Sequence, residues 1–501
     1  MMNRERIKIA LIFIGKPQWE AGWPYIGYDN EEFIGDITTH LVSMFPHVIF
    51  EQNELITTYD RSLIEDIKIK LGDVDGMIIF TIGHYGDPGL ITSGLELINT
   101  KKMPCILANI IYGGDHTFIK LYSLIKEKSH QLYPISSQNF KDFDEYITVL
   151  IDILRMRGEK ILLFATESRE MNWDKVLEII KPERKEILKK HSGFIDQIGS
   201  MKQENFEFFT DLEGADQAHP WRVNPEEYSK RLFQMFGVEL VRGDPDTISQ
   251  YYEMVKEEDA EQIAEKWMEE ANKIEPTRKS IINSAKMYLA LKKVVTDGEK
   301  SYKVFTPDCG TLLLLGKMPA YPCMAFFELS KENIYGICES DTNSAISFLL
   351  GLYLTGRPGY VSNHTLDLVN NRVTYMHCVA PCNYSGNEND PLGYDIVYHG
   401  ESNFLGAVPR VTFPKGEVVT TIKVSIAQEK IALRQGTIID NAEEPGGCVS
   451  KVWVKDNARK ILENYDWNTF GWHRVTFLGD WKKQFEVAAY LLGLEVCVED
   501  R

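Results

Sequence analysis

The sequence predicts an α/β protein with two doubly wound, Rossmann-like parallel-sheet domains, followed by a C-terminal antiparallel β-barrel-like domain. Three observations support this prediction. The first part of the chain alternates continuous apolar runs with helical segments, a pattern typical of parallel strands covered on both faces. A second α/β pattern begins at residue 160, and short strands dominate from about residue 359. We therefore expect domains at 1–156, 157–358 and 359–501.

The N-terminal domain is expected to begin with a buried strand, IKIALIFIG at 7–15. A helix around EEFIGDITTHLVSMF, a strand VIFE and a helix LIEDIKIKL follow, and then apolar strands at 75–83 and 104–114. No G-x-G-x-x-G turn follows the first strand, and the chain contains no P-loop. Nucleotide binding on this sheet is therefore not predicted by any motif.

The second domain begins with the strand KILLFATES at 160–168 and continues into a charged, helix-rich stretch. Within that stretch, EEDAEQIAEKWMEEANKI has the spacing of an exposed amphipathic helix. Apolar segments return with TLLLLGK, CMAFFEL and NIYGICES. A helix SAISFLLGLYLTG closes the domain, with Gly356 expected near its C-cap.

The C-terminal domain is expected to consist of short strands and a final helix. The predicted strands are RVTYMHCVA, DIVYHGES, EVVTTIKVSIAQ, KIALRQGTII, SKVWVK and HRVTFLG, and the helix WKKQFEVAAYLLG ends the chain. Strands of this length and number are typical of an antiparallel barrel.

Composition excludes several classes of function. The 501 residues carry a formal net charge of -18, which argues against binding to nucleic acid or to an anionic membrane surface. No run of about 18 apolar residues predicts a membrane span. Eight cysteines in so long a chain do not form a disulfide framework, so we interpret them as reduced thiols and expect a cytoplasmic protein.

Two carboxylates stand out in the segment CESD. Glu339 and Asp341 follow the apolar strand NIYGIC and precede the helix at 344–356. Helix capping explains Asp341 well, because Asp favours helix starts. It explains Glu339 less well, because Glu339 lies closer to the strand.

Two histidines lie at predicted strand ends. His377 ends the alternating segment RVTYMH, and His473 begins the strand HRVTFLG. Each histidine taken alone is more often a hydrogen-bonded structural residue than a ligand. Cys378 and Cys382 lack the C-x-x-C spacing of redox motifs and are interpreted as buried thiols.

Taken together, these segments resemble the L-fucose/L-arabinose isomerase superfamily. The similar segments are YPCMAFFELSKENIYGICESD, LTGRPGYVSN, VTYMHCVAPC, GESNFLGAVPRVTFPKGEVVTTIKVS and GWHRVTFLGDWKKQFEVAAYLLGLEV. The family usually has Cys-Glu-Gly-Asp where this chain has a serine, Ser340, in the third position. The resemblance is specific over about 305–501 and only architectural before that.

The resemblance implies an activity and an assembly. Family members carry out metal-dependent aldose–ketose isomerisation, usually with manganese, at a site between the second and third domains. A neighbouring subunit often completes that site, so we expect a homo-oligomer, a trimer or a hexamer. The partner of this chain would be a small-molecule sugar substrate.

The resemblance also assigns residues. Glu339 matches the first metal carboxylate and catalytic acid/base, His473 the C-terminal metal histidine, and His377 a histidine used by arabinose-isomerase-like members. The second metal carboxylate would fall at the end of the strand after LTGRPGYVS, where this chain has Asn363. Asparagine offers a carbonyl oxygen to a metal, but it cannot accept a proton at neutral pH.

The departure at Asn363 leaves alternatives open. A second base would have to be Asp341, Asp367 or a water, or the reaction has changed. Carboxylates, imidazoles and an amide oxygen favour manganese, with magnesium or cobalt as alternatives, over thiophilic metals.

Candidate substrate contacts surround the predicted site. They are His399, Ser402, Trp472 and Arg474. An aromatic platform with hydrogen-bonding groups is typical of sugar sites, and an arginine can read a charged substituent. For Arg474, a surface ion pair is an equal alternative.

The sequence therefore predicts a metal-dependent aldose–ketose isomerase. A sugar-binding or regulatory relative without proton transfer is the first alternative, and Asn363 favours it. A second alternative is another metal-assisted reaction on a sugar derivative, such as epimerisation or carbon–carbon cleavage.

Overall fold

The computed structural model describes most of the chain in two compact units. The described residues are 7–17, 25, 27–83, 87–100, 102–126, 131–165, 224–297, 302–386, 391–399, 406–444 and 446–501. The first unit comprises 1–157 and 483–495, and the second comprises 158–482 and 496–501.

The first unit contains a five-stranded parallel sheet in the order β2-β1-β3-β4-β5. Its strands are β1 (Ile7–Ile14), β2 (Val48–Gln52), β3 (Gly76–Thr81), β4 (Cys105–Ile110) and β5 (Leu132–Ser137). Every residue of β3 is buried, which explains why the central strands have continuous apolar sequences. The sequence prediction missed β5, whose segment LYPISS alternates weakly and contains Pro134, as edge strands often do.

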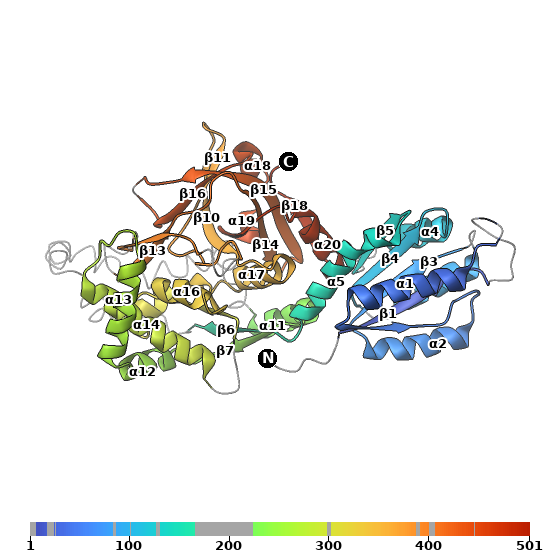
Figure 1. Ribbon diagram of the computed structural model, residues 1–501, viewed down its shortest axis with the longest axis horizontal. Helices are drawn as coiled ribbons and strands as arrows, with labels where there is room; N and C mark the ends of the chain where they lie inside the picture. Colours follow the sequence, from blue (N-terminus) through green and yellow to red (C-terminus); the bar gives the residue numbers. More distant parts are fainter. Residues whose placement is uncertain are drawn as a thin grey trace. The chain divides into compact units, whose positions relative to one another are not determined.

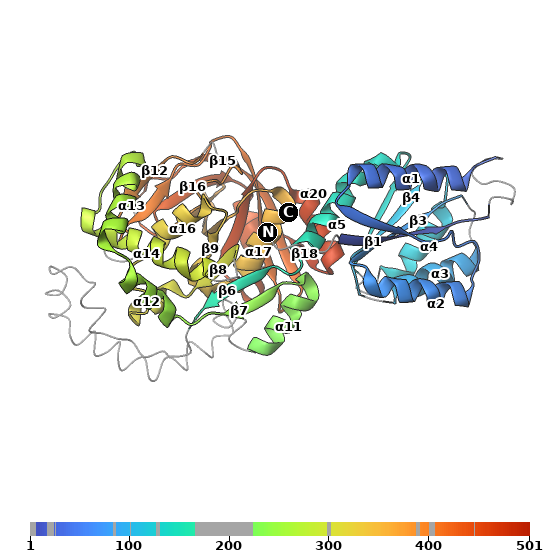
Figure 2. The same ribbon diagram turned by 60° about the horizontal axis from the view of Figure 1, so that its bottom comes forward.

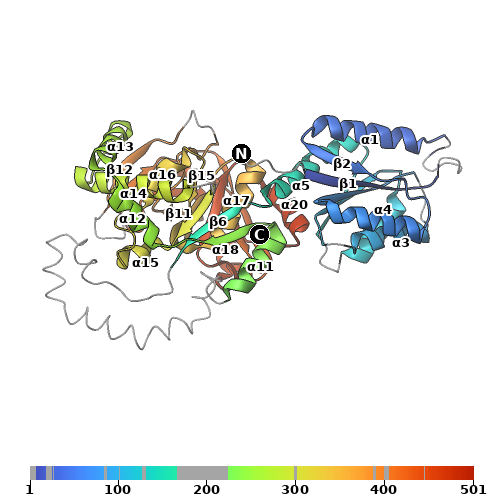
Figure 3. The same ribbon diagram turned by 90° about the horizontal axis from the view of Figure 1, so that it is seen from below.

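Helices cover both faces of this sheet. They are α1 (Asn30–Met44), α2 (Arg61–Lys70), α3 (Pro88–Ile98), α4 (Asp115–Ile125) and α5 (Asp144–Met156). Figure 2 shows α1 on one face and α2 and α3 on the other, and Figure 3 shows α4 beside α3. The arrangement is doubly wound, as predicted.

The helix near the C-terminus, α20 (Lys482–Leu492), belongs almost entirely to the first unit. Lys483 forms a 2.7 Å ion pair with Glu145 of α5, and the ring centroids of Tyr490 and Tyr133 lie 5.7 Å apart. The prediction that this helix ends the chain is wrong. The strand β18 (Glu495–Val498) follows it and extends the second unit's large sheet beside β15 (Lys430–Asn441).

The second unit begins with another parallel sheet, in the order β7-β6-β8-β9. Its strands are β6 (Lys160–Phe164), β7 (Glu239–Arg242), β8 (Val304–Pro307) and β9 (Tyr335–Gly336). Its helices include α11 (Pro225–Phe236), α12 (Asp246–Met254), α13 (Glu257–Glu270), α14 (Arg278–Thr296), α15 (Cys309–Leu314) and α16 (Cys323–Ser330). The predicted amphipathic helix is α13, which buries Ala260, Ala264 and Trp267 on one side.

A closed six-stranded antiparallel barrel is the second main part of this unit. The strands run in the order β14-β17-β10-β11-β16-β15, and β15 pairs back to β14 to close the barrel (Figure 1). They are β10 (Tyr360–Asp367), β11 (Arg372–His377), β14 (Val418–Ser425), β16 (Ser450–Lys455) and β17 (His473–Leu478), together with β15. The predicted strand DIVYHGES lies outside the barrel: β12 (Tyr394–Val397) forms a separate hairpin with β13 (Val408–Val411).

One helix connects the parallel sheet to the barrel. The helix α17 (Thr342–Thr355) packs along β14 and β17, and its C-cap is Gly356 in the left-handed conformation, as predicted. Ser347 accepts a hydrogen bond from the backbone of Val424 at 2.8 Å. A Cβ at Gly351 would lie 1.9 Å from the ring of Phe477, so only glycine permits this approach. The contacts bring the start of α17 to the start of β17.

No helix among the described residues is both long and apolar enough to cross a membrane.

Candidate metal centre

The turn that carries Glu339 is strained. After β9, the short 3-10 helix Cys338–Ser340 contains two consecutive residues in the left-handed region, Glu339 at φ 65° and Ser340 at φ 52°. Non-glycine residues adopt this conformation at a cost, and such strain concentrates at functional sites. The turn leaves the Glu339 side chain 52% exposed, whereas both neighbours are buried.

Asp341, two residues after Glu339, caps the N-terminus of α17, as predicted. Its Oδ1 accepts from the backbone N–H of Ser344 at 2.8 Å, and its Oδ2 accepts from the Ser344 hydroxyl at 2.7 Å. Asp341 has two further partners that the sequence did not predict. They are Nζ of Lys423 at 2.6 Å and Nδ1 of His473 at 3.0 Å, both to Oδ2.

The two histidines come from the strands that flank β10. His377 is the last residue of β11 and His473 the first of β17, as predicted. In the strand order β17-β10-β11 the two rings approach across β10, with their centroids 5.2 Å apart. Asn363 pairs with His473 on one side and with Met376 on the other. It was expected at the end of its strand, but β10 continues to Asp367.

Glu339, His377 and His473 form one cluster. Each offers one ligand atom, and these atoms all lie within 4.8 Å of one another. A carboxylate oxygen of Glu339 lies 3.6 Å from Nε2 of His473, and the other lies 4.0 Å from Nε2 of His377. Both distances exceed that of a good hydrogen bond. The spacing leaves room for an ion among the three groups.

His377 has the properties expected of a residue that binds a metal. Both of its ring nitrogens are buried without a hydrogen-bond partner among the described residues. Burial holds the pKa of His377 well below its ordinary value, and the nearby His473 and His399 add to this effect. The imidazole is therefore neutral, the form that binds metals. A buried polar group without a partner is costly, so its retention fits a ligand role.

The partners of His473 determine its tautomer. A carboxylate oxygen only accepts hydrogen bonds, so Nδ1 of His473 donates to Asp341, and Nε2 is directed toward Glu339. Burial alone would raise the pKa of Asp341, but Lys423 and His473 outweigh it and hold that pKa well below its ordinary value. Metal-binding histidines commonly have such a carboxylate behind them.

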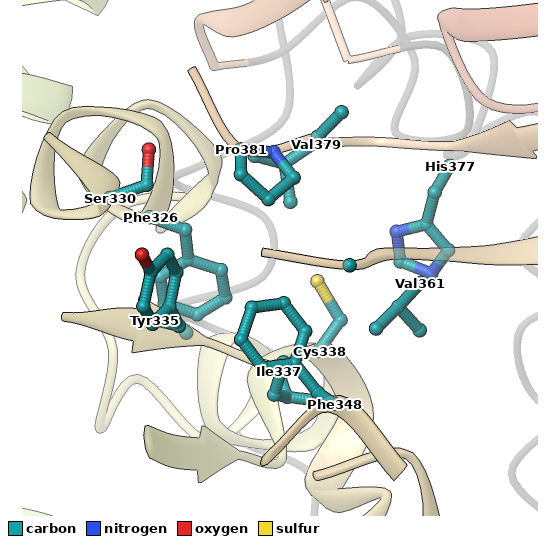
Figure 4. A pocket seen from close by; sticks show the side chains of 13 residues that line it. Phe326, Ser330, Tyr335, Ile337, Cys338, Phe348, Val361, His377, Val379 and Pro381 are labelled. Carbon is teal, nitrogen blue, oxygen red and sulfur yellow. The ribbon is translucent and has the colours of Figure 1, made fainter. Parts of the chain in front are cut away.

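A small cavity lies behind His377. Its volume is about 20 Å³, above the roughly 10–15 Å³ that one ordered water needs. Figure 4 shows His377 and the thiol of Cys338 at one end and the rings of Phe326 and Tyr335 at the other. The lining is mostly apolar, which keeps bulk solvent away from the inner side of the imidazole.

One of the predicted substrate contacts, His399, lies near the cluster. His399 stacks on Tyr321 at 4.5 Å and is close enough to His377 to lower its pKa. Trp472 precedes His473, and its ring is 44% exposed and lies 6.3 Å from that of Trp467. The Trp472 indole N–H donates to the backbone carbonyl of His364 at 3.0 Å, and the role of Trp472 as a substrate contact stays a prediction from the sequence. Ser402 lies outside the described residues.

Arg474 does not lie where the sequence placed it. It follows His473 on β17, and adjacent residues on a strand point to opposite faces. Arg474 is completely buried, and its guanidinium donates to Glu499, with the shortest contact at 2.7 Å. Neither alternative weighed from the sequence holds, because the partner is a buried carboxylate rather than a substrate or a surface group.

Asp367 also lies away from the cluster. Its carboxylate accepts from Arg372 at 3.0 Å and from the side-chain amide of Asn370 at 2.7 Å, in the turn between β10 and β11. Of the two carboxylates considered as a second base, only Asp341 therefore reaches the cluster, and it does so through His473.

Sequence reasoning missed two charged residues that organise this region, Lys423 and Glu499. Lys423 lies within the predicted strand EVVTTIKVSIAQ, where a lysine among buried residues is itself a signal, because lysine is rarely buried without a partner. Glu499 lies only three residues from the C-terminus and carried no signal.

Comparisons with known proteins give limited support. No family model matches the chain. A sulfoquinovose isomerase from Clostridium sp. (strain MSTE9) is 26% identical over 180 residues, which are 34% of this chain and 39% of that protein. The match thus spans less than half the length of this relative. Over these 180 residues the chain is similar to a sugar isomerase.

Proposed function

We propose that this protein is a divalent-metal-dependent sugar isomerase that interconverts an aldose and a ketose. The observation that carries the proposal is the convergence of Glu339, His377 and His473, with the carboxylate half-exposed and the His377 imidazole buried without a hydrogen-bond partner in the described part of the chain. The likeness to a sulfoquinovose isomerase supports the same class of reaction.

The donor set fits a hard or borderline metal. One carboxylate oxygen and two imidazole nitrogens suit manganese, with magnesium or cobalt as alternatives. Bound there, such a metal would polarise the carbonyl and hydroxyl oxygens of the sugar. Asn363 pairs with His473 on the neighbouring strand, so its side-chain amide oxygen is offered on the face of the sheet that His473 occupies.

Glu339 is the residue that would move the proton. Its exposed carboxylate can reach a bound sugar, take a proton from one carbon and return it to the neighbouring carbon. Asp341 is fully engaged by Ser344, Lys423 and His473, so it orients His473 instead of exchanging protons with the sugar. Asn363 cannot accept a proton. The arrangement supports a mechanism with a single base.

The test is hydrogen exchange in D₂O with added Mn²⁺. We expect a panel of aldoses, including sulfoquinovose, to show loss of a C1 or C2 proton signal in ¹H NMR spectra. With a single base, substrate deuterated at C2 should deliver part of its label to C1 of the ketose, because the same carboxylate removes and returns the atom.

The control is a pair of isosteric substitutions. Glu339→Gln should abolish exchange, whereas Glu332→Gln, at a carboxylate paired with Lys292 and Tyr288, should leave it intact. Equal exchange in wild type and Glu339→Gln would refute the role of Glu339. Stoichiometric metal without exchange of any sugar would refute isomerisation of that panel.

Asn363 favours a second candidate, a sugar-binding or regulatory protein without proton transfer. The amide replaces the carboxylate that the resemblance leads one to expect, and no other carboxylate among the described residues joins the three-residue cluster. Sugar binding measured calorimetrically, together with absent exchange, would favour this candidate. The homo-oligomer and the cytoplasmic location stay predictions from the sequence.

A further inference from the structure

The buried side chain of Lys423 carries an inference beyond the three-residue cluster. It is only 2% exposed and lies in the barrel strand β14. An ammonium group is rarely buried to this extent unless it is paired. Its two partners are Oδ2 of Asp341 and the hydroxyl oxygen of Ser344, each 2.6 Å from Nζ.

The backbone fixes Lys423 opposite the start of α17. The neighbouring Val424 donates its backbone N–H to Ser347 of α17 at 2.8 Å, and β14 pairs with β17 from Val419 to Ile422. The strand is thus tied both to the helix that begins at Asp341 and to the strand that begins at His473. Lys423 cannot leave Asp341 without breaking these contacts or changing its rotamer.

The Asp341 carboxylate transmits this constraint to His473. Its Oδ1 is held by the N–H of Ser344, and its Oδ2 receives Lys423, the Ser344 hydroxyl and Nδ1–H of His473. Because three donors converge on one oxygen, the carboxylate has one favourable orientation. That orientation requires a proton on Nδ1 of His473 and leaves Nε2 directed toward Glu339.

We propose that Lys423 is a positioning residue: it holds the Asp341 carboxylate, which in turn fixes His473 with Nε2 free to bind a metal beside Glu339. The inference rests on the proposed function only in treating the cluster as a metal site. It assigns Lys423 no contact with the sugar and no part in proton transfer.

Removal of the Lys423 ammonium group should weaken the constraint on the orientation of both Asp341 and His473. In Lys423→Met the buried carboxylate keeps only the Ser344 and His473 donors, so it can rotate or take up a proton. His473 then loses the acceptor that selects its tautomer. Changes in such outer partners typically weaken metal binding by roughly 10–100-fold.

The first measurement uses metal-free wild-type protein labelled with ¹⁵N histidine. The signals of His473 are assigned by comparison with His473→Gln. We expect the chemical shifts of a single neutral tautomer with the proton on Nδ1. A proton on Nε2, or an equal mixture, would overturn the proposal, and this measurement does not require Lys423→Met to fold.

The second measurement compares Mn²⁺ affinities by calorimetry. We expect Lys423→Met to bind Mn²⁺ roughly 10–100-fold more weakly than wild type and to show mixed His473 tautomers. Lys423→Arg keeps the positive charge and should restore part of both properties. Unchanged affinity and an unchanged tautomer in Lys423→Met would overturn the proposal.

A matched control separates positioning from general stability. Lys331→Met also removes an ammonium from a buried carboxylate, Glu328 at 2.8 Å, which belongs to the same unit but not to the cluster. This variant should bind Mn²⁺ as wild type does. If both variants lose affinity equally, the effect is structural and the proposal fails. Absence of sugar exchange in wild type with a fixed tautomer would instead refute only the isomerase.

Discussion

Two polar clusters in the second unit each contain one glutamate, but they differ in how the charged and polar groups around it are paired. The candidate metal cluster, Glu339, His377 and His473, leaves its carboxylate half-exposed and one imidazole without a hydrogen-bond partner among the residues that the structure describes. The ion-pair cluster, Arg434, Arg474 and Glu499, is buried completely around one carboxylate. The two guanidiniums reach Glu499 at 2.8 and 2.7 Å. Consecutive residues of β17, His473 and Arg474, belong to different clusters.

The comparison shows how residues that stabilise the fold can be distinguished from residues that are placed to bind a ligand. In the ion-pair cluster each charge has an opposite charge within reach, so the residues stabilise one another. In the metal cluster the groups stop short of hydrogen bonding, at 3.6 and 4.0 Å, and His377 bears an uncompensated burial cost. Substitutions at Glu499 and at His377 should therefore change the free energy of unfolding in opposite directions, and two further predictions concern Asp456 and Ser340, which are neighbours of the two clusters.

The largest effect is expected for Glu499→Ala. It leaves two guanidiniums buried without their shared carboxylate, so the free energy of unfolding should fall by about 3–5 kcal/mol. Urea denaturation followed by circular dichroism measures this change. A loss below about 1 kcal/mol would show that the cluster behaves like a surface ion pair and would break the comparison.

The second prediction concerns His377→Leu in metal-free protein. Because the imidazole is buried with no hydrogen-bond partner within the described ranges, an apolar side chain should raise the free energy of unfolding by about 1–3 kcal/mol. Mn²⁺ binding, measured by calorimetry on the same samples, should weaken strongly. A destabilised variant would mean that His377 has structural partners, and unchanged Mn²⁺ binding would exclude it as a ligand.

The third prediction is a pH dependence in the ion-pair cluster. Asp456 lies 3.6 Å from Arg434, and burial raises its pKa to about 6, although Arg434 opposes the shift. The unfolded-state pKa is about 3.9. Between these values the folded state binds the extra proton, so the contribution of Asp456 to stability is present below about pH 4 and is lost as the pH rises toward 6.

Asp456→Asn should remove this slope. At pH 7 the variant should gain on the order of 1–3 kcal/mol in free energy of unfolding, and near pH 4 it should match wild type. Denaturation curves at several pH values measure the difference. A variant less stable than wild type at pH 7 would show that Asp456 is an ionised partner that Arg434 needs.

The smallest effect is expected for Ser340→Gly. Ser340 adopts a φ of 52°, which costs an L-residue about 1–2 kcal/mol, whereas glycine loses about 0.5–1 kcal/mol of backbone freedom on folding. The net change in unfolding free energy should be a gain of up to about 1 kcal/mol, with Mn²⁺ affinity unchanged. Weaker Mn²⁺ binding would show that the serine side chain or the strain itself positions Glu339.

Much of the fold was predictable because its signals are local. Continuous apolar runs such as Ile7–Ile14 gave the parallel strands, and helical spacing gave α13 and α17 with its Gly356 cap. Segments with weak patterns failed. The edge strand β5, which contains a proline, was missed. CMAFFEL, for which the sequence indicated only an apolar segment, forms α16, which is buried on every side and shows no periodicity.

The candidate site was predictable only in part. Motifs pointed to Glu339, His377 and His473, which lie far apart in the chain and converge in the structure. The same reasoning misplaced Arg474, because a residue next to a site in sequence points to the other face of its strand. It also missed Lys423, whose importance depends on its contact with Asp341, 82 residues earlier in the chain.

The sequence by itself determined the order of α/β and barrel segments and the residue types available for a metal site. These properties follow from short-range patterns of hydrophobicity and from side-chain chemistry. Only the tertiary structure decided which polar groups are paired and which are left for a ligand. Pairing depends on strand register and on how α17 meets β14 and β17, and these are long-range contacts that no local pattern encodes.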